Sequence, residues 1–149
     1  MQTNSAFKKI QFIHFAIIFG ILIFAVTFLL PLPKLSFQLN FDNILFDFTM
    51  VWSVLVFIFH NSFYKNELTN VNFLETPHEK WQKYQTSHLI RMAILEGTLI
   101  LNIVLLSKDP NYYYTILIAI NYLFMFEYHP NISKIATEWH LTEEEIKNL

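Results

Sequence analysis

The sequence predicts an all-α membrane protein, an up-down bundle of four transmembrane helices with both termini in the cytoplasm. Hydrophobic residues make up 54% of the 149 residues and charged residues only 15%, which is too apolar for a soluble domain of this length. The apolar residues gather in four blocks, each near the roughly 20 residues that a spanning helix needs: 10–30, 44–64, 88–107 and 112–128. We therefore expect a transmembrane domain at 1–130 and a helical cytoplasmic tail at 131–149.

The distribution of basic residues predicts the orientation. Seven lysines precede the first block, separate the second from the third, or follow the fourth: Lys8, Lys9, Lys65, Lys80, Lys83, Lys134 and Lys147. The two other connections carry one lysine each, Lys34 and Lys108. By the positive-inside rule both termini are cytoplasmic, and the expected location is the bacterial inner membrane, crossed several times. The first block lacks a signal-peptide cleavage pattern, so we expect it to be retained.

The connection after the first block has a pattern of its own. Pro31 and Pro33 end the first helix, because proline cannot donate a backbone hydrogen bond. Apolar and polar residues then alternate over 35–42, a period of two that is typical of extended chain. We expect this segment to lie along the outer membrane interface.

Two capping sequences predict helix starts on the cytoplasmic side. Thr76 is followed by Pro77 and then by Glu79, which together form a capping box with proline in the first turn. The third helix is therefore expected to begin near Pro77, before its apolar block. The stretch 141–145 repeats the Thr and Glu spacing and predicts a short amphipathic helix that runs to the C-terminus.

Glu96 lies near the middle of the third apolar block and is the sharpest chemical signal in the sequence. An ionisable group at that depth costs several kcal/mol unless it is paired, protonated or hydrated, so it indicates a functional site. The candidates nearest in depth are Asn121 and Ser53, and neither is a cation. We expect a protonated carboxyl that hydrogen-bonds Asn121. The alternative is a carboxyl that only joins helices.

Arg91 is the other ionisable residue of this block. Four polar residues share one face of the third helix: His88, Arg91, Thr98 and Asn102. Glu96 lies roughly 140 degrees away from Arg91, so an ion pair within the helix is disfavoured. We expect the Arg91 guanidinium either to extend toward the inner membrane interface or to pair with Glu127 at the inner end of the fourth helix. The candidate proton- or ion-handling residues are thus Glu96, Asn121, Asn102, Arg91 and Glu127.

Small residues at mid-span indicate close helix packing. Gly97 adjoins Glu96, and Ala93 lies one turn before it, so a neighbouring helix or subunit can approach here. Gly20, at the middle of the first block, is a possible counterpart. The patch favours a homo-oligomer or a larger membrane complex.

The histidines form a competing constellation, with one in or beside each block: His14, His60, His88 and His129. All four fall toward the predicted cytoplasmic end, and histidines on facing helices can ligate haem or a metal. However, three of them lie near the water interface, and the i, i+4 zinc spacing is absent. The expected cofactor and metal content is therefore none, with a haem or metal carrier kept as a third alternative.

Two resemblances accompany these patterns. The segment 89–97, together with Ile13 and His14, 20–24 and 141–144, resembles a family of small uncharacterised membrane proteins of Bacteroidota. That family brings no established activity. The run from Arg91 to Val104, with Ala93, Leu95 and Glu96, is similar to the carboxylate-bearing helix of rotary ATPase proteolipid subunits. That resemblance covers about one helix and implies a proton-carrying role for Glu96 alone.

The sequence also excludes several function classes. It contains no nucleophile and base motif, no phosphate-binding loop and no nucleotide fingerprint, so we expect no enzyme. Its basic residues are scattered, which argues against nucleic-acid binding. With no cysteine, disulfides are excluded. The expected function is a proton- or ion-handling membrane component that uses Glu96, with a non-catalytic accessory or scaffold subunit as the alternative; the lipid bilayer is the expected partner.

Overall fold

A computed structural model describes residues 5–30, 35, 44–74 and 76–148, and these residues are largely helical. The long helices among them are α1 (Ser5–Leu29), α2 (Ile44–Asn70), α3 (Pro77–Lys108) and α4 (Tyr112–Glu127). A 3₁₀ helix, η1 (Val71–Phe73), extends α2, and two short helices form the tail, α5 (Ile132–Glu138) and α6 (Glu143–Asn148). The predicted all-α class is confirmed. Most of the predicted extended segment, 36–42, lies outside the described residues.

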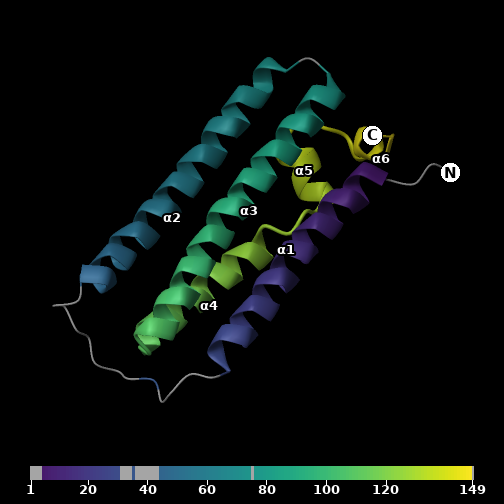
Figure 1. Cartoon of the computed structure of the whole chain (residues 1–149). Coiled ribbons are helices and arrows are strands. Elements are labelled where there is room, and N and C mark those ends of the chain that lie inside the picture. The colour runs from purple at the N-terminus through teal and green to yellow at the C-terminus, as the bar shows by residue number, and fades with distance from the viewer. Residues whose placement is uncertain (1–4, 31–34, 36–43, 75, 149) are drawn as a thin grey trace.

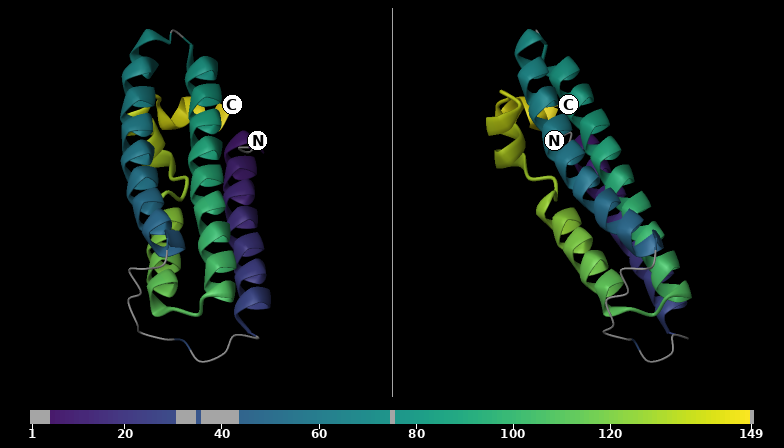
Figure 2. Two further views of the ribbon diagram at one scale, coloured as in Figure 1. Left: turned by 60° about the vertical axis from the view of Figure 1, so that its left-hand side comes forward. Right: turned by 90° about the vertical axis from the view of Figure 1, so that its left-hand side faces the viewer.

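Helix α3 is the central element of the fold. Helices α1, α2 and α4 all pack against it. Successive long helices run in opposite directions, so α1 and α3 run the same way (Figure 1). The views in Figure 2 show α1 and α2 on the two sides of α3, with α4 crossing behind them. The chain therefore wraps three helices around α3.

Three helices are long and apolar enough to cross a membrane, at Ala6–Leu29, Ile44–Phe73 and Pro77–Lys108. Helix α4 has only 16 residues and spans about 24 Å at 1.5 Å per residue, somewhat less than the hydrocarbon thickness of a bilayer. The structure thus supports three candidate spans directly. Helix α2 continues past its predicted apolar block to Asn70, and α3 begins before its block, at Pro77. The added turns are polar and lie next to the tail.

The capping sequences begin helices as predicted. The Thr76 hydroxyl accepts from the Glu79 backbone N–H at 3.2 Å, and the Glu79 carboxylate accepts from the Thr76 N–H at 3.1 Å. In the tail, Thr142 and Glu145 make the same reciprocal pair, at 3.1 and 2.7 Å. Two otherwise unpaired N–H groups are satisfied at each start.

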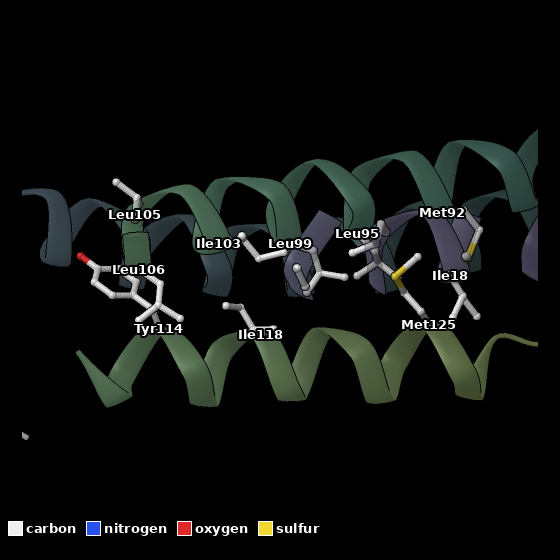
Figure 3. Packing of buried hydrophobic residues seen from close by; sticks show 12 residues of the cluster. Ile18, Met92, Leu95, Leu99, Ile103, Leu105, Leu106, Tyr114, Ile118 and Met125 are labelled. Atoms are coloured by element: carbon white, nitrogen blue, oxygen red, sulfur yellow. The ribbon is translucent and has the colours of Figure 1, made fainter. Parts of the chain in front are cut away.

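The core divides into two clusters. The first joins α1, α3 and α4 along the middle of the long helices, and Figure 3 shows Ile118 and Met125 of α4 facing Leu99 and Leu95 of α3. The second cluster packs the tail against the start of α1, the start of α3 and η1 at the end of α2. Its buried members are Phe7, Ile10, Val71, Trp81, Tyr84, Ile135, Trp139, Leu141 and Ile146. The tail is therefore packed against the long helices.

Candidate functional site

Arg91 is the centre of a polar site inside the bundle, close to the docked tail. Its side chain is buried, and its Nε atom donates to Nε2 of His60 on α2 at 3.1 Å. The guanidinium carbon lies 3.8 Å from the ring centroid of Tyr64 and 4.0 Å from that of Tyr128. The cation is thus held between two aromatic faces, an arrangement that stabilises a desolvated charge by about 2 kcal/mol per contact.

The predicted ion pair between Arg91 and Glu127 is not formed. Within the described part of the chain, no carboxylate lies within ion-pair distance of Arg91. Glu127 is exposed instead, and its neighbour Tyr128 faces the guanidinium. Successive helical residues point about 100 degrees apart, so the face that a residue presents depends on the rotation of α4, which the sequence does not give.

Three histidines from different parts of the chain meet beside Arg91, and we name His14, His88 and His129 the histidine cluster. The ring of His14 lies 5.2 Å from that of His88 and 5.6 Å from that of His129, between centroids. His14 is fully buried and His88 nearly so. Helices α1 and α3 and the segment after α4 each supply one ring.

The cluster is short of hydrogen-bond partners. Among the described residues, both ring nitrogens of His14, Nε2 of His88 and Nδ1 of His129 are buried without a partner. A neutral imidazole needs one acceptor for its N–H and one donor for its other nitrogen, and an unmet need in a buried site costs about 1–3 kcal/mol. A bound water molecule can donate to one ring nitrogen and accept from another. An imidazole nitrogen that takes up a proton changes from an acceptor to a donor.

Two adjacent spaces lie between the surface and this cluster. The surface hollow has a volume of about 630 Å³ and is lined by Glu127, His129, Asn131, Ser133, Lys134, Thr137 and Glu138. The inner cavity has a volume of about 20 Å³, which holds about one water molecule, and it reaches His88 and Arg91. The two spaces share His129, Asn131, Lys134 and Glu138. Tyr64 closes one wall by donating its hydroxyl to the Glu138 carboxylate. Polar side chains therefore line both of the adjacent spaces between the surface and the buried rings.

The residues predicted to surround Glu96 do not assemble around it. Asn121 donates from Nδ2 to the backbone oxygen of Leu117 at 2.8 Å, and Asn102 donates in the same way to Thr98 at 2.8 Å. Glu96 is partly exposed, at the border between the core-facing and outward-facing sides of α3. Within the described ranges its carboxylate makes no hydrogen bond or ion pair, so the expected bond to Asn121 is not formed.

The predicted packing residues face outward. A methyl group added at Gly97 or at Gly20 would meet no atom within 4 Å. Gly97 and Ala93 line an open groove of about 760 Å³ between α2 and α3, which we name the α2–α3 groove; Trp52 and Phe59 form its other wall. These small residues do not hold the helices of one chain together.

Histidine geometry also bears on the metal and haem alternative. Among the residues that the structure describes, no group of three or more His, Asp or Glu side chains has the spacing of a metal site. The rings of His14 and His88 are in direct contact, whereas two axial haem ligands stand on opposite faces of the macrocycle. The observed arrangement does not favour either centre.

The sequence contained a signal for the histidine cluster that the interpretation around Glu96 left unused. His14 lies on the same helical stripe as Ile10, Ile18 and Ile21, which are all buried. A histidine on an apolar stripe points into the core, and His88 shares a face with Arg91. What the sequence did not reveal is the role of the tail, whose Lys134 and Glu138 line the inner cavity.

Comparison with family models, with curated proteins and with solved structures found no match to this chain.

Proposed function

We propose that this protein is a non-enzymatic membrane component that takes up and exchanges protons at the histidine cluster. The observation that carries the proposal is that the ring of His14 contacts those of His88 and His129. Four nitrogen atoms of these three rings are buried and lack hydrogen-bond partners in the described structure. Imidazole is the side chain whose unperturbed proton affinity is nearest to neutral pH, and it can accept a proton on one nitrogen while it releases one from the other.

The route for protons begins in the surface hollow. Glu127, Glu138 and His129 lie along its lining, so exchangeable groups continue from the surface to the first ring of the cluster. The inner cavity then brings about one water molecule to His88 and Arg91. On the far side lies the apolar core cluster of α1, α3 and α4, so a proton that crosses the membrane passes this core only when the core opens transiently. The arrangement supports a half-channel that is open toward the tail and that conducts while the core is open.

The membrane arrangement proposed with this function has four spans and both termini in the cytoplasm of a bacterial inner membrane. Helix α4 is short for a span, but it lies along α3 and is bracketed by polar Asn111 and the Glu127 end. Local thinning or tilt accommodates such a mismatch at a small cost per Å. The surface hollow then faces the cytoplasm, in agreement with the orientation that the lysine distribution predicts.

Proton flux into liposomes tests the proposal. Purified protein is reconstituted with a pH-sensitive dye inside, and a potassium gradient with valinomycin drives proton entry. Wild type should acidify the lumen faster than empty liposomes, whereas His14→Gln and His88→Gln should fall to the empty level. His78→Gln is the matched control, since His78 is exposed and contacts only Gln82 in the described structure.

Glu96→Gln separates this site from the one that the sequence predicted. The substitution should leave flux unchanged, because Glu96 lies off the route. Flux that is lost in Glu96→Gln and retained in His88→Gln would move the site to Glu96. Wild-type flux no greater than that of empty liposomes would end the proposal. Circular dichroism of each variant checks that the helices remain folded.

An accessory or scaffold subunit is the second candidate, and the α2–α3 groove favours it. The groove is open beside Gly97, where another helix can come close to the backbone. Gly97→Leu should then abolish co-purification of a partner after mild detergent extraction, while Ile100→Phe, an exposed apolar position on the same helix, should not. A wild-type protein that purifies alone under these conditions would exclude this candidate.

A further inference from the structure

A second groove lies on the other side of α2, between α2 and α4, and we name it the α2–α4 groove. Its volume is about 330 Å³, and its walls are mainly apolar, with Ser53 and Asn121 as polar side chains along them; the apolar wall residues include Met50, Val54, Phe57, Leu117, Ile120 and Phe124. Leu95 of α3 forms its floor. Val54 and Ile120 are 58% and 42% exposed, so the groove opens sideways, toward lipid if α2 and α4 span the membrane. A space of this size and lining is typical of a binding site for one small apolar molecule.

One end of the α2–α4 groove is polar. His60 and Tyr128 line it there, and both also contact Arg91. Tyr128 in addition lines the inner cavity on its other side. The guanidinium is therefore one side chain away from the end of the groove.

The polar end is suited to an anion. Arg91 is buried without a carboxylate at ion-pair distance in the described chain, and an uncompensated cation is unfavourable in a membrane interior. His60 accepts from Arg91 through Nε2, so the proton of its neutral ring is on Nδ1, which is then a donor. The Tyr128 hydroxyl is a second potential donor. An acidic group at this end would accept these hydrogen bonds and compensate the charge of Arg91.

From this charge complementarity we propose that the α2–α4 groove binds a single-chain amphiphile with a carboxylate head, a fatty-acid anion. The head lies at His60 and Tyr128, and the tail runs along Phe57 and Leu117. The volume corresponds to about eleven water-sized groups, which suits part of one acyl chain and not the two chains of a phospholipid. This site goes beyond the proposed proton exchange, because the histidine cluster does not line the groove.

Photo-crosslinking of the wild-type protein tests the inference without any substitution. The protein is placed in nanodiscs of phosphatidylcholine together with palmitic acid that carries a diazirine on its tail, or with the methyl ester of the same molecule. The sample is then illuminated to activate the diazirine. The acid should label groove residues roughly tenfold more than the ester, the effect expected of a charge-assisted hydrogen bond. Equal labelling by both, or labels spread evenly over the outward faces of α2 and α4, would overturn the inference.

A pair of adjacent substitutions gives the matched test. Leu117→Trp fills the groove and should remove most of the labelling by the acid, whereas Ile116→Trp adds the same side chain to the exposed face of α4 and should not. Competition by phosphatidylglycerol that matches or exceeds competition by palmitate would show a phospholipid site and also refute the inference. Proton flux of Leu117→Trp should equal that of wild type. The labelling experiment therefore tests fatty-acid binding separately from proton exchange at the histidine cluster.

Discussion

Arg91 donates from Nε to Nε2 of His60 at 3.1 Å, and this bond joins α2 to α3 in the interior of the protein. Few residues of α2 are buried, and His60 is one of them, so this bond helps to attach α2 to α3 beside the ion pair of Glu67 with Lys83. His60→Phe removes the acceptor and leaves a buried charged donor unsatisfied. We expect a loss of about 1–3 kcal/mol in the free energy of unfolding. Thermal unfolding in detergent, followed by circular dichroism, measures it.

His60→Gln is the control for this prediction. The glutamine side-chain oxygen can accept from Arg91, so this variant should recover part of the stability. If His60→Phe and His60→Gln unfold at the same temperature as wild type, the bond does not stabilise the contact between α2 and α3.

The Thr76 capping box predicts a local loss of stability. Thr76→Ala removes the acceptor for the Glu79 backbone N–H and should destabilise the start of α3 by about 0.5–2 kcal/mol. Hydrogen exchange of the amides in the first turn reports this directly. Thr86→Ala, at an exposed position inside the same helix, should change stability little. Equal exchange in wild type and Thr76→Ala would show that proline and packing alone hold this end.

Docking of the tail depends on Ile146, whose side chain is fully buried in the cluster that contains Trp139. Ile146→Ala should cost about 2–5 kcal/mol of local stability, because the cavity that it leaves adds to the lost burial. Limited proteolysis should then cut the tail much faster than in wild type, and Trp139 fluorescence should shift to the red. The neighbouring Lys147→Ala is the control, since Lys147 is exposed. A protected tail in Ile146→Ala would show that burial of Ile146 does not hold the tail against the long helices.

The sequence predictions that are confirmed concern interactions between residues close together in the chain, and those that are wrong concern contacts between distant segments. Thr76 and Thr142 each specify a helix start through contacts three residues away, so the sequence alone sufficed. The partner of Arg91 depends on how α4 is rotated, and the choice between Glu127 and Tyr128 is made by packing between distant segments. A hydropathy pattern contains the length and depth of a helix but not its rotation against several neighbours.

The environment of Glu96 shows the same limit. The depth of each residue along the membrane was predictable from the sequence. Because Glu96, Asn121 and Ser53 lie at similar depth, they were predicted to be neighbours. In the structure Ser53 and Asn121 line the α2–α4 groove with Leu95, while Glu96 is the next residue along α3 and points about 100 degrees away. Depth also placed His14, His88 and His129 at the same end of the helices, but their contact depends on which faces of α1 and α3 pack together, and depth does not give that.

Glu145 gives the fold a predicted acid dependence. The backbone N–H and the side-chain hydroxyl of Thr142 both donate to its carboxylate, and these hydrogen bonds lower the pKa of Glu145 below its usual 4.5. The unfolded tail therefore binds the proton more readily than the folded one. The resulting stabilisation of α6 is fully present above about pH 4.5 and is lost as the pH falls through the lowered folded pKa.

Carbon NMR of the Glu145 carboxyl, together with the amide shifts of α6, measures this transition. The carboxyl should titrate below 4.5, and the helix should fray over the same interval. Glu145→Gln keeps an acceptor but cannot titrate, so it should flatten the acid dependence of α6, whereas Glu144→Gln, one residue earlier and exposed, should leave it in place. A Glu145 carboxyl that titrates at or above 4.5 would mean that the bonds from Thr142 to this carboxylate do not persist in solution.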